Sequence, residues 1–204
     1  LLVSVAMTGV AQKDYSKSEG LLKYVDPYIG SGFHGHVFVG TSVPYGMVQV
    51  GPNNIHKGWD WCSGYHYSDS ILIGFSQTHL NGTGCTDLGD IMIMPMNEIR
   101  TERGKQSDIS NGYASKYSHK NEIARPEYYS LLVERYNIKA EMTATDRVGF
   151  HRYTYPAGKP ASILVNLHEG NSYTKAKMCY VRKVDDYTIE GYRYSHDWSP
   201  NRKV

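Results

Sequence analysis

The chain has 204 residues and a formal net charge of +2, with 22 Lys and Arg against 20 Asp and Glu. This length suits one all-β domain, or one domain plus a fragment of another, and a folded chain of this size buries roughly 70% of its unfolded surface. The balanced charge creates no strong electrostatic field, which argues against nucleic acid or an anionic membrane as a partner.

Tyrosine is the unusual part of the composition, with 18 Tyr against four Phe. Tyrosine suits strands in which the ring is half buried and the hydroxyl stays in contact with water. The composition fits the surface of a tyrosine-rich β-sandwich. It also fits an aromatic platform for carbohydrate, and both interpretations stay open here.

The first 11 residues, LLVSVAMTGVA, form an apolar run with small residues near its end. We interpret residues 1–11 as the remnant of a signal peptide and residues 12–24 as a polar leader, which predicts export to a bacterial periplasm or to the extracellular space. A buried N-terminal strand is the alternative. No other run approaches the ~18 apolar residues of a membrane span.

Residues 21–30 are predicted to form a short helix or turn that leads into an extended segment, because Pro27 disfavours a helical conformation at Asp26. A glycine-rich loop with two histidines, His34 and His36, follows, and it lacks both the P-loop and the dinucleotide-binding pattern. Residues 37–50 alternate and predict two short strands around a turn. Residues 51–54, GPNN, predict another turn.

The stretch from Trp59 to Asp90 combines aromatic, acidic and glycine residues with one short apolar run at residues 71–73. So many polar groups do not fit a plain core strand, and so many aromatic rings do not fit a disordered linker. We expect turns and short strands that present these side chains at one rim. Flat aromatic faces beside Asp, His and Asn are typical of sugar-binding surfaces.

Short strands continue to the end of the chain without sustained helical periodicity, apart from a polar surface excursion predicted at residues 97–125. Residues 161–167 are the most apolar of these strands and are predicted to be central. Two alternating segments separated by Asp185-Asp186 predict a hairpin. The other predicted strands are residues 91–96, 128–136, 139–144 and 148–155. The pattern predicts an all-β, antiparallel β-sandwich with long loops and few short helices.

Several residue types leave alternatives open. Three cysteines, Cys62, Cys85 and Cys179, have no CxxC spacing, and a disulfide between the first two cannot be deduced from the sequence. If Trp59 and Trp61 lie on a strand, they point to opposite faces, so one anchors the core and the other is available to a sugar.

Four carboxylates lie in the rich stretch, but their spacing assigns none of them to glycosidic bond cleavage. Asp69 and Asp87 are expected to bond backbone amides in turns. These aspartates are Asp60, Asp69, Asp87 and Asp90.

Six blocks of the sequence, taken together, resemble the N-terminal domain of family 92 glycoside hydrolases. The resemblance extends from about Val25 to Trp198. The blocks are YIGSGFHGH at 28–36, VPYGMVQ at 43–49, CSGYHY at 62–67, GFSQTHLNGTGC at 74–85, YNIKAE at 136–141 and VGFHRY at 148–153.

The resemblance implies an exo-acting, inverting, calcium-dependent α-mannosidase in which a β-sandwich, here residues 25–204, packs on an (α/α)6 barrel. In that family the catalytic acid and base and most calcium ligands belong to the barrel, so no catalytic or metal-binding residue is expected in this chain. The chain is expected to provide part of the pocket for an α-mannoside glycan. The residues carried over as substrate-binding are Phe33, His34, His36, Trp59, Asp60 and His79.

The sequence departs from the family pattern at Gln77, where a histidine is expected, and at Val39, where a proline is expected. Two other functions stay open. One is a stand-alone carbohydrate-binding module that uses the same aromatic rim. The other is a metal-dependent enzyme that uses four histidines, His34, His36, His66 and His79.

Overall fold

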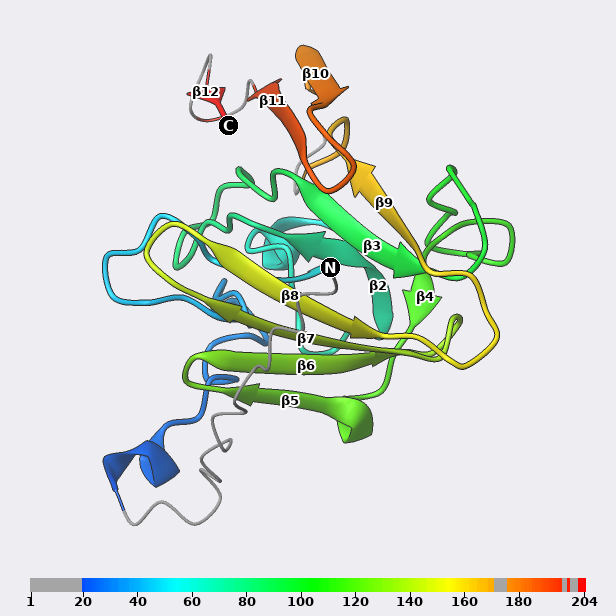
Figure 1. The fold of residues 1–204 in the computed structure, drawn as a ribbon. Coiled ribbons are helices and arrows are strands. Elements are labelled where there is room, and N and C mark those ends of the chain that lie inside the picture. The colour runs from blue at the N-terminus through cyan, green and yellow to red at the C-terminus, as the bar shows by residue number, and fades with distance from the viewer. Residues whose placement is uncertain (1–19, 171–175, 196–197, 199–201) are drawn as a thin grey trace, which may run out of the picture.

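The computed structural model describes residues 20–170, 176–195, 198 and 202–204. The predicted signal-peptide remnant, residues 1–11, and most of the predicted leader lie outside these residues. The described part is built from antiparallel strands with three short 3-10 helices, which confirms the predicted all-β class (Figure 1). None of the described helices is long and apolar enough to cross a lipid bilayer.

Two sheets form the body of the domain. The first has the order β1-β2-β3-β9, with β4 also paired to β2, and the second has the order β5-β6-β7-β8. The strands of the first sheet are β1 (Gly51–Asn54), β2 (Ile71–Ser76), β3 (Met92–Met96), β4 (Ser115–Lys116) and β9 (Ser162–Asn166). Those of the second are β5 (Glu122–Arg125), β6 (Tyr128–Val133), β7 (Ile138–Ala144) and β8 (Gly149–Thr154).

The core lies between these two sheets, as in a sandwich. Phe75 of β2 meets Tyr129 of β6 edge to face, with ring centroids 6.5 Å apart. Alternate residues of β7 point inward, and each partner strand adds its own inward set. The residues with the most fully buried side chains include Leu72, Met92, Met94, Leu131, Ile138 and Met142.

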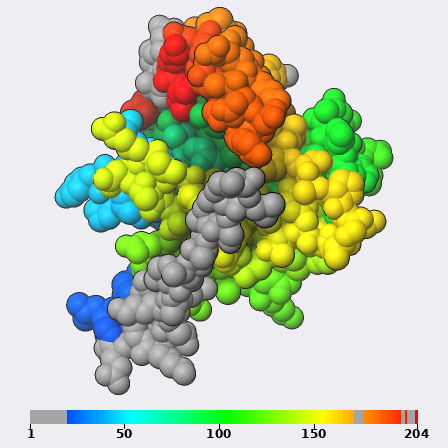
Figure 2. All heavy atoms as spheres, viewed as in Figure 1, coloured from blue at the N-terminus to red at the C-terminus, as the bar shows by residue number. Residues whose placement is uncertain are grey.

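A third sheet of three strands projects from one end of the body, where the β10–β11 hairpin (orange) covers the top of the space-filling view (Figures 1 and 2). Its strands are β10 (Met178–Lys183), β11 (Ile189–Ser195) and β12 (Arg202–Lys203). The predicted hairpin is therefore confirmed. A buried ion pair between Asp90 and Arg193, 2.9 Å long, joins this sheet to the loop before β3.

Three sequence predictions about elements are wrong. Residues 51–54 form strand β1 rather than a turn, and Pro52 is tolerated because β1 lies at the edge of its sheet. Residues 37–50 form a loop with one bridge, Thr41 to Val50, because Tyr45 adopts a left-handed conformation after Pro44.

The third error concerns β9, which lies at the end of the described sheet and is half exposed rather than central. The predicted excursion at residues 97–125 holds for its first half. Its second half enters the core through tyrosines in place of aliphatic residues, and both Tyr113 and Tyr117 are buried. The segment then forms β4, the 3-10 helix η4 (His119–Asn121) and β5.

Candidate functional site

The glycine-rich loop and the two-tryptophan segment meet at the surface. Residues 59–61 form the 3-10 helix η3, not a strand, so the two indoles are placed by a turn. Trp61 is the anchor, because its Nε1 donates to Asp69 Oδ2 at 2.9 Å and its ring stacks on His66 at 4.4 Å. Trp59 keeps 56% of its surface exposed and is the indole available to a ligand.

Asp69 holds this anchor from the interior. Its Oδ1 accepts the backbone amides of Ser70 and Ile71, and its Oδ2 lies 2.8 Å from Lys57 Nζ. Asp87 likewise accepts the amide of Leu88 at 2.7 Å. The expectation that these two aspartates bond backbone amides is confirmed.

Two histidines of the glycine-rich loop converge on one carboxylate. His34 Nδ1 lies 2.5 Å from Asp60 Oδ1, and His36 Nε2 lies 3.8 Å from the same oxygen. The hydrogen bond from His34 is the main cause that lowers the pKa of Asp60, so this carboxylate is ionised near neutral pH. His36 is buried, and its Nε2 has no hydrogen-bond partner among the described residues.

Trp59 packs over these histidines. Its ring lies edge to face with His36 at 4.2 Å and tilted beside His34 at 5.3 Å. Gly84 approaches the indole so closely that a Cβ at this position would lie 2.5 Å from Trp59 Nε1. The loop that carries Gly84 is tied to the glycine-rich loop, because the amide of Gly82 donates to the carbonyl of His36 at 2.7 Å.

A cavity of about 500 Å³ opens beside Trp59. Its lining includes Cys62 and Cys85, which the sequence did not assign to a site, together with Trp198 and His56. Cys62 donates its thiol hydrogen to the carbonyl of Trp59, whereas Cys85 is an exposed free cysteine. The spacing of residues in the sequence did not indicate that these residues line one cavity, since they come from separate loops.

Phe33 lies at the rim and is 88% exposed, with a left-handed backbone. Its carbonyl oxygen lies 3.2 Å from His66 Nε2, which joins the glycine-rich loop to the segment after η3. The structure thus brings Phe33, His34, His36, Trp59 and Asp60 to one surface.

His79, the sixth predicted site residue, lies in the interior with 3% exposure. Burial is the main cause that lowers its pKa to about 4, so the ring is neutral. Its Nδ1 donates to the carbonyl of Gln49 at 2.8 Å, which makes Nε2 an acceptor. Asn53 Oδ1 lies 2.6 Å from Nε2, while Asn53 Nδ2 has no hydrogen-bond partner within the described part of the chain, so exchanging the two atoms of this amide gives Nε2 its donor. His79 therefore supports the strand and loop behind the surface.

The described residues contain no group of three or more His, Cys, Asp or Glu side chains that could hold a metal ion. Since His79 is bound to Asn53 and His66 to Ser68, the proposed four-histidine metal site is wrong. Gln77, which replaces an expected histidine, has its Oε1 3.2 Å from His151 Nε2.

The domain is a β-sandwich that displays an indole, imidazoles and a carboxylate beside a cavity. Comparison with known proteins gives the particular family. Residues 24–204 match the glycosyl hydrolase family 92 N-terminal domain, and the chain belongs to this family.

Relatives of known structure share the fold. A family GH92 α-mannosidase from Bacteroides thetaiotaomicron, solved in complex with mannoimidazole, is 38% identical with a TM-score of 0.85, over 89% of this chain and 24% of that one. The GH92 family glycosyl hydrolase ccman5 is 27% identical with a TM-score of 0.71, over 89% of this chain and 25% of that one.

A curated relative, an uncharacterized secreted glycosidase from Arthroderma benhamiae, is 30% identical over 154 residues, which make up 72% of this chain and 20% of that protein. A GH92 inverting mannosidase from Bacteroides thetaiotaomicron, at 23% identity and a TM-score of 0.65, shows the shared fold. The chain therefore spans about a fifth of the curated relative's length.

Proposed function

We propose that this chain is the N-terminal domain of an exported, inverting α-mannosidase that hydrolyses terminal α-mannosides of glycans. The observation that carries the proposal is the convergence of His34, His36 and Asp60 beneath the exposed indole of Trp59, within a family 92 domain. The solved relative with mannoimidazole supports a mannoside as substrate. The secreted relative supports export.

The surface supplies contacts that suit a pyranose. The open face of Trp59 is available to the C–H face of a sugar ring, a contact worth on the order of 1 kcal/mol beyond its buried area. Asp60 is ionised and accepts hydrogen bonds from hydroxyls. Phe33 extends the apolar rim.

The cleavage step requires groups that this surface does not provide. Inversion needs a carboxylic acid and a carboxylate about 6.5–9.5 Å apart on opposite sides of the glycosidic bond. We assign both groups, and most calcium ligands, to a further domain of the longer polypeptide on which this domain packs. We propose no role for calcium at this surface, because the described residues form no cluster of three or more His, Cys, Asp or Glu side chains that could hold a metal ion.

The experiment compares this chain with the longer polypeptide, using an α-mannoside in the presence of calcium. The longer polypeptide is expected to release mannose, the isolated chain is not, and Trp59→Ala in the longer polypeptide is expected to raise KM. Turnover by the isolated chain would contradict the assignment of the catalytic acid and base to a further domain. Absence of turnover by the longer polypeptide on every α-mannoside would overthrow the assigned activity.

Exposure of Phe33 and Trp59 on the isolated domain favours a second candidate function, a self-sufficient carbohydrate-binding module. Calorimetry of the isolated chain with mannose distinguishes the two. Saturable binding that Trp59→Ala abolishes would favour the binding module, and the pocket-wall function predicts no measurable heat.

A further inference from the structure

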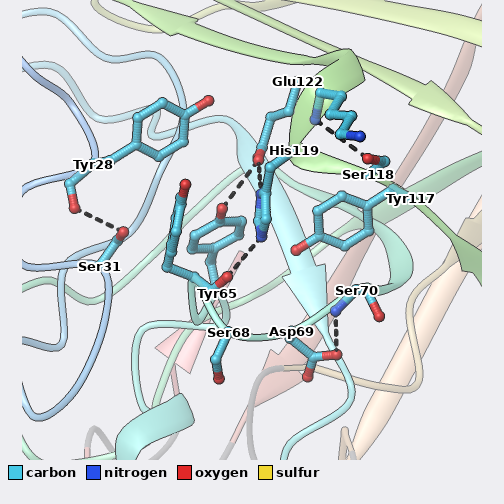
Figure 3. A network of polar contacts seen from close by, with 12 residues as sticks. Tyr28, Ser31, Tyr65, Ser68, Asp69, Ser70, Tyr117, Ser118, His119 and Glu122 are labelled. Carbon is cyan, nitrogen blue, oxygen red and sulfur yellow. Dashed lines mark hydrogen bonds and ion pairs between the residues drawn. The ribbon is translucent and has the colours of Figure 1, made fainter.

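A buried carboxylate lies behind the candidate site, at the start of β5. The side chain of Glu122 has no solvent exposure. Its carboxyl group accepts a hydrogen bond from the Tyr65 hydroxyl at 3.1 Å and lies 2.5 Å from His119 Nδ1 (Figure 3). The Tyr129 hydroxyl also donates to it, at 2.6 Å.

The tyrosines stay donors in this arrangement. Burial is the main cause that raises the pKa of Tyr65 and Tyr129 far above the ordinary value, and the Glu122 carboxylate adds to the effect. The nearby Tyr28 and Tyr117 show the same direction, with burial first and Glu122 second.

His119 faces an acceptor at each of its two ring nitrogens. Nδ1 meets Glu122 Oε2 at 2.5 Å, and Nε2 meets the backbone carbonyl of Tyr67 at 2.6 Å. A carbonyl oxygen cannot donate, so the ring donates the bond at Nε2. The ring of Tyr67 stacks on the imidazole at 4.3 Å and Tyr117 meets it edge to face at 5.5 Å.

The residue that His119 holds is joined to the candidate site. The amide of Tyr67 donates to the carbonyl of Ser31 at 2.8 Å, and the neighbouring His66 contacts the carbonyl of Phe33. The ring of Tyr67 also packs edge to face on Tyr28 at 5.5 Å. The loop held in this way continues directly into His34, which bonds Asp60.

We propose that His119, held between Glu122 and Tyr67, is a positioning residue that fixes the Tyr67 carbonyl and thereby the loop that carries His34. Its effect on sugar binding rests on the proposed function, whereas its hold on the loop does not.

Nitrogen-detected NMR of the histidine rings of the full chain tests the contact directly. Nε2 of His119 is expected to carry a hydrogen that exchanges slowly with water, because it is bound to the Tyr67 carbonyl. The exposed His168 is the internal reference, and its ring hydrogens are expected to exchange fast. Equally fast exchange at His119 Nε2 would overturn the proposal.

Amide hydrogen exchange tests the hold on the loop. His119→Gln keeps a polar side chain but cannot reach both acceptors, so exchange of the Tyr67 amide is expected to accelerate at least tenfold, while amides of β7 exchange as before. His168→Gln is the matched control and is expected to change neither. Unchanged protection of Tyr67 in His119→Gln would overturn the proposal, and if that variant does not fold, the NMR measurement on the parent chain still decides.

Activity of the longer polypeptide gives a third, separable result. His119→Gln is expected to raise KM for an α-mannoside several-fold more than it lowers kcat. If the parent enzyme cleaves no mannoside, the proposed function fails, and the ring NMR and amide exchange still test the role of His119.

Discussion

The neutral histidine behind the site predicts a specific loss of stability in acid. His79 is buried, and its pKa falls from the ordinary 6.5 to about 4, with burial as the main cause. As the pH falls below 6.5 the unfolded chain binds a proton that the native chain excludes, so the free energy of unfolding decreases. The stabilisation is fully present above about pH 6.5 and is lost progressively as the pH falls to about 4.

The magnitude follows from the size of the shift. At about 1.4 kcal/mol per pKa unit, His79 contributes up to about 3 kcal/mol of acid sensitivity. His151 on β8, whose pKa burial also lowers to about 4, adds a second contribution over the same window. Together they amount to a large fraction of the ~5–15 kcal/mol that stabilises a typical domain.

Urea unfolding followed by tryptophan fluorescence, repeated between about pH 7 and pH 4, measures this effect. His79→Gln is expected to be less stable than the parent at pH 7, because packing on Phe38 is lost, and to lose less stability on acidification. The exposed His168→Gln serves as the control. A parent-to-variant difference that stays constant across the pH range would refute the reasoning.

Three further predictions concern other contacts. The pKa of Glu141 falls to about 2, chiefly through its hydrogen bond with Arg152, so its carboxylate stabilises the fold above about pH 4.5. Glu141→Gln should therefore lower the free energy of unfolding by about 1–2 kcal/mol at pH 7, a value reduced by solvent screening at the exposed Arg152. Near pH 2 the same substitution should cost almost nothing, and urea unfolding measures both values. Arg193→Met should cost about 3 kcal/mol by the same assay and expose the β10–β11 hairpin to limited proteolysis. Gly84→Ala should displace the Trp59 indole and shift its fluorescence while changing thermal stability by less than about 1 kcal/mol.

The sequence predicted well those elements whose periodicity reflects the sandwich. The meander from Tyr128 to Thr154 alternates because each strand has one face in the core, and local patterning is enough to find it. Strand β1 was missed because its Asn53 and Asn54 look like turn residues. Asn54 is buried only because Ile71 and Tyr117 supply distant partners for its side chain.

The candidate site was likewise predicted only in part. The resemblance to the family led to His34 and Asp60, but the hydrogen bond between them joins residues 26 positions apart, and no local pattern predicts it. His79 lies in the most recognisable block, yet it is turned inward toward Asn53. Whether a histidine faces a ligand or the interior depends on which distant acceptors the fold brings to it.

The contact between Ser195 and Asp90 has a consequence for how the protein is made. These residues are 105 positions apart, and the Ser195 hydroxyl and the Arg193 guanidinium both reach the same buried carboxylate oxygen. At about 5–20 residues per second, a ribosome needs about 5–20 s to travel from one to the other. During that interval Arg193 and Ser195 have not yet been synthesised, so they cannot contact Asp90. The loop before β3 therefore stays exposed to water in the nascent chain until the last strands emerge.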